Sequence, residues 1–242
     1  MDTSYWTNLN SRIISDHTRK QFFNRYLCKL VMNVPCARLV NQHDDLGLAL
    51  NHRQQTQRHP NYGGSWGYGA WHQQQVKDAR VSQLEIVRSI KLDYKDNIKV
   101  RVEEPWVQFY AETEDELKVI ATRFDDVCNS RLVSISVPFN DSQAATLRAG
   151  DIIVSKDTGF EYKVHIRDGL YSPETKAQLL AYFDSLGDEV QLSKGTRKQL
   201  EGPLGYIWGL FFYVKDPKTL TFISLIHPTF IRKIHKLVPL NK

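Results

Sequence analysis

Aromatic and cationic side chains occur close together in two stretches of this sequence. Residues 206–214 read YIWGLFFYV, and residues 59–75 read HPNYGGSWGYGAWHQQQ, with further arginines nearby. An aromatic ring offers a face on which an unpaired base stacks, worth about 1–3 kcal/mol per base, and lysine or arginine neutralises phosphate. The two stretches therefore predict a site for single-stranded nucleic acid.

The sequence offers little for catalysis. It contains no G-x-x-x-x-G-K-[ST], G-x-S-x-G, H-E-x-x-H or G-x-G-x-x-G motif. Its acidic clusters fall at an expected hairpin and at expected helix ends, as on a solvated surface. His43, Asp44 and Asp45 are a candidate metal-binding group, but adjacent residues on a polar turn seldom converge on one ion. We therefore predict no catalytic residue, no metal and no cofactor.

Composition and charge set wider limits. The chain has 242 residues, 41% of them hydrophobic, which is enough for one large domain or two small ones. Lysine and arginine outnumber aspartate and glutamate by 32 to 27, which permits a polyanionic partner. No apolar run approaches the roughly 18–20 residues of a membrane-spanning helix, and the first residues lack an export signal. Three cysteines without C-x-x-C spacing indicate reduced thiols. We expect a cytoplasmic protein that does not bind a membrane.

Local patterns predict an α+β fold. Residues 160–168 alternate between polar and apolar and predict a strand. Ser172 followed by Pro173 begins a helix over 172–186. The elements after it are a strand at 189–193, a polar connection at 194–205, a strand at 206–214, a helix after Asp216 and a strand at 230–238. The order β-α-β-β-α-β is that of a ferredoxin-like unit.

An internal repeat predicts a second unit of the same kind. Residues 106–138 align with 208–239, because each segment runs from a tryptophan through an acidic helix start to a strand ending Val-Pro. Thr113 and Glu116 make a capping box in the first copy. We predict two tandem ferredoxin-like (βαββαβ) units. The predicted parts are a helical extension (1–24), unit one (25–140) with an insertion (41–95) that holds a helix near 76–92 and an aromatic loop (59–74), a linker or hairpin (141–159) and unit two (160–242).

Alternation along the strands predicts which side chains leave the core. Helices cover one face of each sheet, so the less apolar set of side chains should lie on the open face. The open face of the first sheet is predicted to carry Lys29, Val31, Asn33, Lys99, Arg101, Glu103, Trp106, Gln108 and Tyr110. The open face of the second is predicted to carry Lys163, His165, Arg167, Tyr206, Trp208, Leu210 and Phe212, with Ile207, Gly209, Phe211 and Tyr213 inside. The candidate nucleic-acid ligands on these open faces are Lys29, Lys99, Arg101, Trp106, Gln108 and Tyr110 in the first sheet, and Lys163, His165, Arg167, Tyr206, Trp208 and Phe212 in the second.

The loop 59–74 supplies four further candidate ligands, Tyr62, Trp66, Tyr68 and Trp71, among four glycines. A flexible aromatic loop flanked by basic residues would close over a nucleotide strand. The alternative is an Ω-loop whose aromatic side chains pack on their own domain.

Aromatic and basic residues on a four-stranded sheet resemble the arrangement of an RNA-recognition motif, which implies RNA as the ligand. The chain departs from that family because GYIWGLFFYV lacks the Lys/Arg-Gly start of its main signature. Tandem ferredoxin-like units also look like the CRISPR-associated endoribonucleases of the Cas-six type. That resemblance implies metal-independent RNA cleavage, with His165, His59 and His72 as the histidines of interest, but their C-terminal glycine-rich loop is replaced here by LIHPTF.

Three functions therefore stay open. The main prediction is a non-enzymatic protein that binds single-stranded nucleic acid, RNA rather than DNA. The second is an assembly or adaptor subunit of a viral or replication complex, which docks on a protein partner or a second copy through its apolar sheet face and aromatic loop. The third is a metal-independent ribonuclease.

Overall fold

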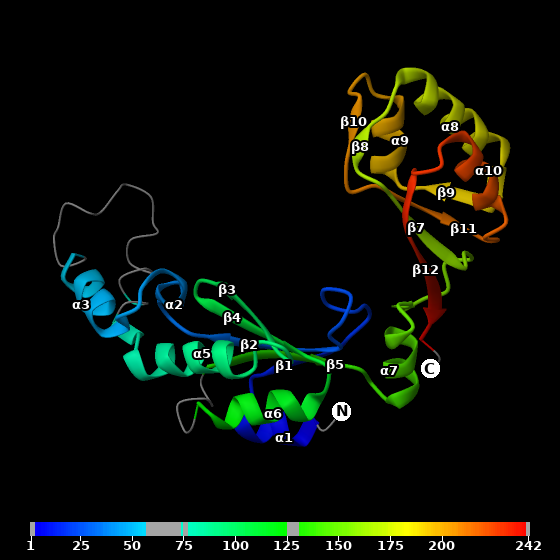
Figure 1. The fold of residues 1–242 in the computed structure, drawn as a ribbon. Coiled ribbons are helices and arrows are strands. Elements are labelled where there is room, and N and C mark those ends of the chain that lie inside the picture. The colour runs from blue at the N-terminus through cyan, green and yellow to red at the C-terminus, as the bar shows by residue number, and fades with distance from the viewer. Residues whose placement is uncertain (1–2, 57–73, 75–76, 125–130, 241–242) are drawn as a thin grey trace. The chain divides into compact units, whose positions relative to one another are not determined.

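The structure is a computed structural model that describes residues 3–56, 74, 77–124 and 131–240. It is a mixed α+β structure with two five-stranded sheets (Figure 1). The chain divides into two compact units, Met1–Ala144 (unit 1) and Ala145–Lys242 (unit 2). The loop aromatics Tyr62, Trp66, Tyr68 and Trp71 and the histidines His59 and His72 lie outside the described residues.

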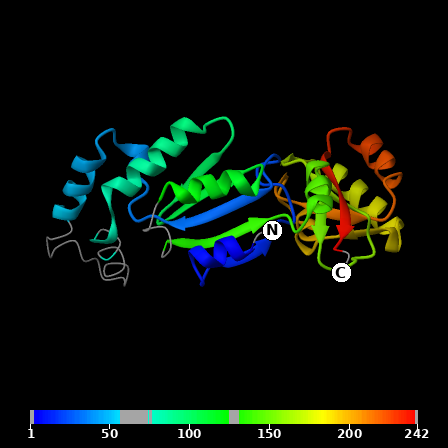
Figure 2. The ribbon, with the colours of Figure 1, turned by 90° about the horizontal axis from the view of Figure 1, so that it is seen from below.

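Unit 1 contains a five-stranded sheet in the order β1-β5-β2-β4-β3. Its described elements are α1 (Thr3–Leu9), β1 (Ile14–His17), β2 (Cys28–Asn33), α2 (Leu39–Gln42), α3 (Leu46–Thr56), α5 (Val81–Asp93), β3 (Lys99–Glu103), β4 (Trp106–Ala111), α6 (Glu114–Thr122), β5 (Leu132–Val137) and α7 (Asp141–Arg148), which crosses into unit 2. Both α6 and α1 lie on the same side of the sheet (Figures 1 and 2). The Trp6 indole of α1 donates to Glu114 at the start of α6, 2.9 Å away, which ties the two helices together.

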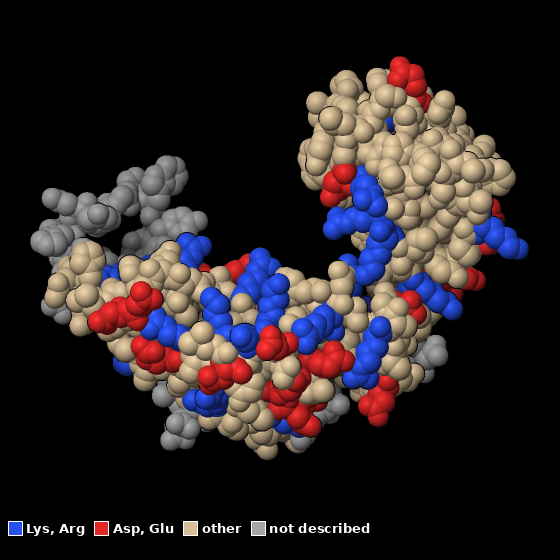
Figure 3. Space-filling model, in the orientation of Figure 1, with Lys and Arg blue, Asp and Glu red and all other residues tan. Residues whose placement is uncertain are grey.

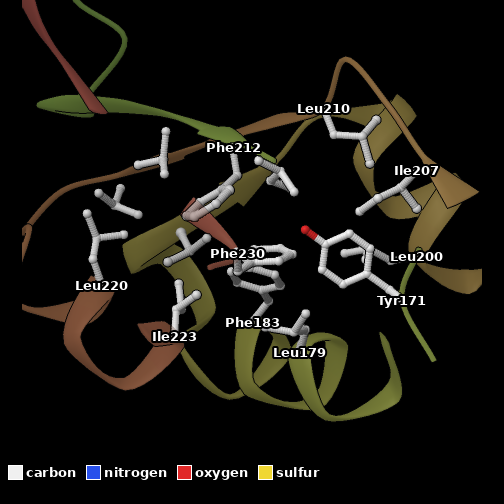
Figure 4. Close-up of a cluster of buried hydrophobic side chains, with 14 residues drawn as sticks. Tyr171, Leu179, Phe183, Leu200, Ile207, Leu210, Phe212, Leu220, Ile223 and Phe230 are labelled. Atoms are coloured by element: carbon white, nitrogen blue, oxygen red, sulfur yellow. The ribbon is translucent and has the colours of Figure 1, made fainter. Parts of the chain in front are cut away.

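Unit 2 contains a five-stranded sheet in the order β6-β12-β7-β11-β9 and a separate two-stranded sheet of β8 and β10. Its elements are β6 (Ile152–Val154), β7 (Tyr162–Ile166), β8 (Gly169–Leu170), α8 (Pro173–Ser185), a 3-10 turn (Gly187–Glu189), β9 (Val190–Leu192), α9 (Lys194–Glu201), β10 (Tyr206–Ile207), β11 (Phe211–Val214), α10 (Thr219–Ile226) and β12 (Ile231–Pro239). Its core lies between the five-stranded sheet and the helices α8, α9 and α10 (Figure 4).

The two sheets share one strand order. In unit 1 the strands β2, β3, β4 and β5 lie in the order β5-β2-β4-β3, and in unit 2 the strands β7, β9, β11 and β12 lie in the order β12-β7-β11-β9. Each set therefore has its first and third strands at the centre. Each sheet also has a fifth strand that was not predicted, β1 or β6, which runs parallel to the last strand of the set.

Most elements that rest on local signals are confirmed. Thr113 and Glu116 form the predicted capping box at the start of α6. The Ser172 hydroxyl accepts from the amide of Thr175, and Pro173 is the first residue of α8. In each case the signal lies within one helical turn, so the rest of the chain has little influence on it.

The predicted continuous strand over 206–214 is wrong. The run is split into β10 and β11, and Gly209 between them has a φ of 66°, a left-handed conformation that favours glycine. The split shifts the alternation by one residue. Leu210 and Phe212, predicted on the open face, are 4% and 0% exposed, whereas Phe211 and Tyr213, predicted inside, are half-buried on the opposite face.

The Phe212 ring lies at the centre of the unit 2 core (Figure 4). Its centroid is 5.0 Å from that of Phe183 on α8 and 6.5 Å from that of Phe230, which precedes β12. This side chain therefore ties the sheet to its covering helix.

The predicted polar connection at 194–205 is also wrong, because Lys194–Glu201 forms α9. Ser193 caps the helix by accepting from the amide of Thr196, and Thr196 and Leu200 supply its buried side. Two buried residues in a strongly polar segment form too sparse an apolar stripe to reveal a helix in the sequence.

Two glycines in this region should respond to alanine in opposite directions. Gly209→Ala is expected to destabilise unit 2 by about 1–2 kcal/mol, because an alanine at this positive φ is strained. Gly195→Ala in α9 is expected to stabilise it by roughly 0.5–1 kcal/mol, because the new Cβ meets only the Ser193 hydroxyl, 3.9 Å away. Urea denaturation followed by circular dichroism measures both changes. A neutral Gly209→Ala would contradict the strand break.

Candidate nucleic-acid interface

The open face of the unit 1 sheet carries the residues that alternation predicts. Along β2 the inward residues Cys28, Leu30 and Met32 are buried, and the alternate residues are half-buried. Residues directly opposite in an antiparallel pair share a face, so the strand register defines rows across it. One row runs Lys99–Tyr110–Lys29, the next Arg101–Gln108–Val31, and the last Glu103–Trp106–Asn33.

Part of this face is covered by the chain itself. The rings of Phe22 and Phe23 pack on Tyr110, with centroids 5.3 and 4.9 Å from its ring, and leave Tyr110 only 4% exposed. Burial, the largest influence, raises the pKa of the Tyr110 phenol. Tyr110 is therefore not a stacking surface as predicted. Phe23, which packs on Tyr110, is 46% exposed, and Lys99 Nζ lies 3.8 Å from its ring centroid.

The other end of the unit 1 face is open. Trp106 is 39% exposed and lies across from Asn33. Beside it, Gln108 donates to Glu103 at 2.8 Å, and Arg101 forms an ion pair with Glu103. An exposed indole, an arginine and two amides therefore lie on neighbouring strands, which is the chemistry for stacking a base and contacting its phosphate.

The open face of unit 2 carries a matching pair of residues. Lys163 of β7 lies opposite Tyr213 of β11, as Lys29 lies opposite Tyr110 in unit 1. The next row places His165 beside Phe211 on one side and Lys233 on the other. Lys163 Nζ is 3.7 Å from the Phe211 ring centroid and 5.9 Å from that of Tyr213. The aromatic residues beside the basic strand are therefore Phe211 and Tyr213.

Phe211 is held in position by a buried hydroxyl. Thr196 of α9 is fully buried, and its Oγ1 donates to the Phe211 carbonyl at 2.6 Å and accepts from the Phe211 amide at 3.2 Å. These bonds satisfy the backbone of β11 immediately after the break at Gly209.

Thr196→Val, which keeps the shape and removes the hydroxyl, is expected to destabilise unit 2 by about 1–3 kcal/mol, since it leaves buried backbone groups of Phe211 unpaired. Thermal denaturation followed by circular dichroism measures the loss. Thr196→Ser keeps the hydroxyl and should retain more of the stability. Equal losses in both variants would assign the effect to packing alone.

Two of the unit 2 histidines, His165 and His235, lie on neighbouring strands of the five-stranded sheet. His165 and His235 have ring centroids 5.3 Å apart, and His235 is 3% exposed with its Nδ1 bonded to the Gly150 carbonyl at 2.6 Å. The Nε2 atom of His165 is buried as well. Acid–base chemistry on a bound RNA requires an accessible imidazole nitrogen, so any such role of His165 would fall to its Nδ1 atom.

Four predicted ligands of unit 2 do not lie on the open sheet face. Tyr206 and Trp208 are 50% and 56% exposed, but Tyr206 belongs to the two-stranded arm of β8 and β10, and Trp208 follows it. Arg167 lies just beyond β7, where its Nε donates to the Thr229 carbonyl at 2.9 Å. Phe212, the fourth, is a core residue. The sequence reasoning did not place Phe23, Phe211, Tyr213 and Lys233 beside the open faces, and Gly209 was a local signal that could have shifted the register of β11.

Charge is distributed unevenly on the visible surface of each unit (Figure 3). In unit 1, lysine and arginine gather on the side of β3 and β4, and aspartate and glutamate gather over α6. In unit 2, basic side chains gather over β7 and β12, and the surface over β8 and β10 carries little charge on the face shown. The basic regions therefore coincide with the sheets that carry the aromatic residues.

No group of three or more histidine, cysteine, aspartate or glutamate residues is arranged to hold a metal within the described part of the chain. The Asp45 carboxylate accepts from the amide of Leu48 at 2.8 Å, which caps the start of α3. The helices of the described residues include none with the length and apolarity needed to cross a membrane. No protein-family model matches the chain, and no curated protein and no solved structure matches it either.

Proposed function

We propose that this protein binds single-stranded nucleic acid, RNA in preference to DNA, by stacking bases on aromatic side chains of its two open sheet faces. The observation that carries the proposal is a cation–π contact between a lysine ammonium and an aromatic ring on each of the two faces. Lys99 Nζ lies over Phe23 in unit 1 at 3.8 Å, and Lys163 Nζ lies over Phe211 in unit 2 at 3.7 Å. A base stacked at such a ring would have a cation within reach of its phosphate.

The fold supports this proposal. We infer that each unit is a ferredoxin-like βαββαβ fold with one added parallel strand, because both sheets have the strand order 4-1-3-2 when the added strand is left out. In this arrangement the helices cover one face of the sheet, and the two central strands present their alternate side chains on the other. Those central strands are β2 and β4 in unit 1, and β7 and β11 in unit 2.

Separate roles follow for the side chains of the unit 1 face. Trp106, 39% exposed, would stack a base. Lys99 and Arg101 lie on the edge strand β3 and would neutralise phosphates there. A single-stranded nucleic acid that crosses the sheet passes over this edge. Lys29 lies beneath Phe22, 5.3 Å from the ring centroid, so it supports the covering loop and contributes less to binding.

In unit 2 the proposed stacking residues are Phe211 and Tyr213, with Lys163 and Lys233 as cations. The preference for RNA rests on the likeness of this placement to an RNA-recognition motif, in which unpaired bases stack on the two central strands.

Fluorescence anisotropy of labelled single-stranded RNA and DNA oligomers tests the proposal. We expect RNA binding at low salt that weakens at about 0.15 M salt, because log K falls by about 0.7 per decade of salt for each phosphate neutralised in a single strand. Quenching of tryptophan fluorescence should accompany binding. Absence of binding to either oligomer at low salt would contradict the proposal.

A second candidate function is docking on a protein partner. The apolar sheet face that suggested it is not available, because Leu210 and Phe212 are buried. A different observation favours it: Leu170, Leu204, Tyr206 and Trp208 are each at least half exposed on or beside the two-stranded arm. Apolar docking at this arm would be insensitive to salt, which distinguishes it from phosphate binding.

A further inference from the structure

A pocket of about 320 Å³ opens in unit 2 between α8, the end of α9 and the segment that leads into β10. Most of its lining is apolar: Tyr171, Pro173, Ala177, Leu180, Leu200 and Pro203. Its volume lies at the lower end of the range of small-ligand pockets. It lies away from the open sheet face, because Tyr171 and Leu200 belong to the core on the helix side of the sheet.

Lys176 brings a buried positive charge to this pocket. The residue lines the pocket and is 4% exposed. Its ammonium donates to the carbonyl oxygens of Gly202 and Leu204, the second at 3.0 Å, and so caps the end of α9. An ammonium has three N–H donors, and these two bonds use two of them.

No carboxylate neutralises this lysine within the part of the chain that the structure describes. Glu201 also lines the pocket, but its carboxylate pairs with Arg197 at 3.4 Å. Two neutral carbonyls satisfy donors without cancelling the charge, and an uncompensated buried charge favours an anionic partner. The pocket therefore combines an apolar lining with a cation that a carboxylate would complement.

The surface around the pocket is apolar and extended. Leu204 lies between the lining residues Pro203 and Gly205, and it is 67% exposed. Leu170, next to Tyr171, is 79% exposed and lies opposite Tyr206 in the two-stranded arm. A ligand held only inside the pocket would leave this rim uncovered, whereas a peptide chain that leaves the pocket would pass over it.

We propose that the pocket binds the C-terminal end of a partner protein whose last residue is apolar. The terminal carboxylate accepts a hydrogen bond from Lys176, the last side chain enters the apolar lining, and the preceding residues lie over Leu204 and the arm. The charge of Lys176 favours a chain end with an apolar last residue, because there the carboxylate and the apolar side chain belong to the same residue. This inference goes beyond nucleic-acid binding and does not depend on it.

Isothermal titration of the full chain with an acetylated pentapeptide ending in Leu-Phe tests the proposal. The free-acid peptide is expected to bind at least about tenfold more tightly than the same peptide with a C-terminal amide, which loses the charge-assisted bond. Phenylacetate, which has the ring and the carboxylate without a peptide chain, is expected to bind at least about tenfold more weakly than the free-acid peptide. Equal binding of acid and amide, or no binding of the acid, overturns the proposal. Phenylacetate binding as tight as the peptide overturns the chain end as the occupant.

Two variants locate the site. Ala177→Glu places a carboxylate in the lining at an exposed helix position, where it should leave folding intact and weaken the free-acid peptide by about tenfold. Gln178→Glu adds the same charge one residue further along the helix, outside the lining, and should change little.

Lys176→Met should abolish the preference for the acid over the amide. Trp106→Ala, which weakens RNA binding in the proposed function, should leave peptide binding unchanged, so the two proposals fail separately. Equal effects of the two glutamate variants would contradict the assigned pocket.

Discussion

Phe212→Ala is expected to destabilise unit 2 by about 3–5 kcal/mol, because it removes a fully buried ring and leaves a cavity. The ring contacts Phe183 and Phe230, so its removal weakens the packing between the sheet and α8. Urea denaturation followed by circular dichroism gives the change in unfolding free energy. Where the alanine variant does not fold, Phe212→Leu supplies a smaller, measurable loss of the same sign.

Trp208→Ala is the matched control for this experiment. Trp208 is the larger side chain and belongs to the same run of the sequence, but it is 56% exposed. Substitutions at such a position usually change stability by no more than about 0.5 kcal/mol. Equally small losses for the two variants would place both side chains on the open face, as an uninterrupted strand requires, and would contradict the register set at Gly209.

Trp106→Ala is expected to weaken single-stranded RNA binding by roughly 10- to 100-fold. The estimate corresponds to one stacked base at about 1–3 kcal/mol. The indole is exposed on the open face, so its removal should leave the fold of unit 1 intact. Anisotropy titrations of the wild-type and variant chains with the same labelled oligomer measure the ratio.

Two further comparisons separate stacking from other causes. Val119→Ala changes an exposed apolar residue on α6, on the helix side of unit 1, and should leave RNA affinity unchanged. Arg101→Gln should instead reduce the salt dependence, by about 0.7 in the slope of log K against log salt for one lost phosphate contact. A Trp106→Ala chain that binds RNA like the wild type would remove unit 1 from the proposed interface.

The same logic separates the two aromatic sets of unit 2. Phe211 faces Lys163 on the sheet, whereas Trp208 belongs to the arm region. Phe211→Ala should therefore weaken RNA binding, and Trp208→Ala should not. The expectation from sequence alternation was the reverse, so this pair tests the structural register directly.

The sequence by itself determined the features that depend on neighbouring residues. The capping box of Thr113 and Glu116 and the cap at Ser172 are satisfied within one turn, so the surrounding fold has little influence on them. Alternation along β2 and β4 assigned the open face of unit 1, because both strands are continuous and a period of two fixes the face of every residue.

Only the tertiary structure decided which aromatic residues lie on the open faces. One left-handed residue, Gly209, reverses the face of every later side chain in β11, and its conformation is stabilised by contacts with distant segments. Its amide donates to Asp168 at 2.7 Å, and Thr196 holds the backbone of the strand that follows. Phe22 and Phe23 likewise cover Tyr110 from about ninety residues away in the chain. A periodic pattern extends only along its own strand, whereas these contacts depend on which segments the whole fold brings together.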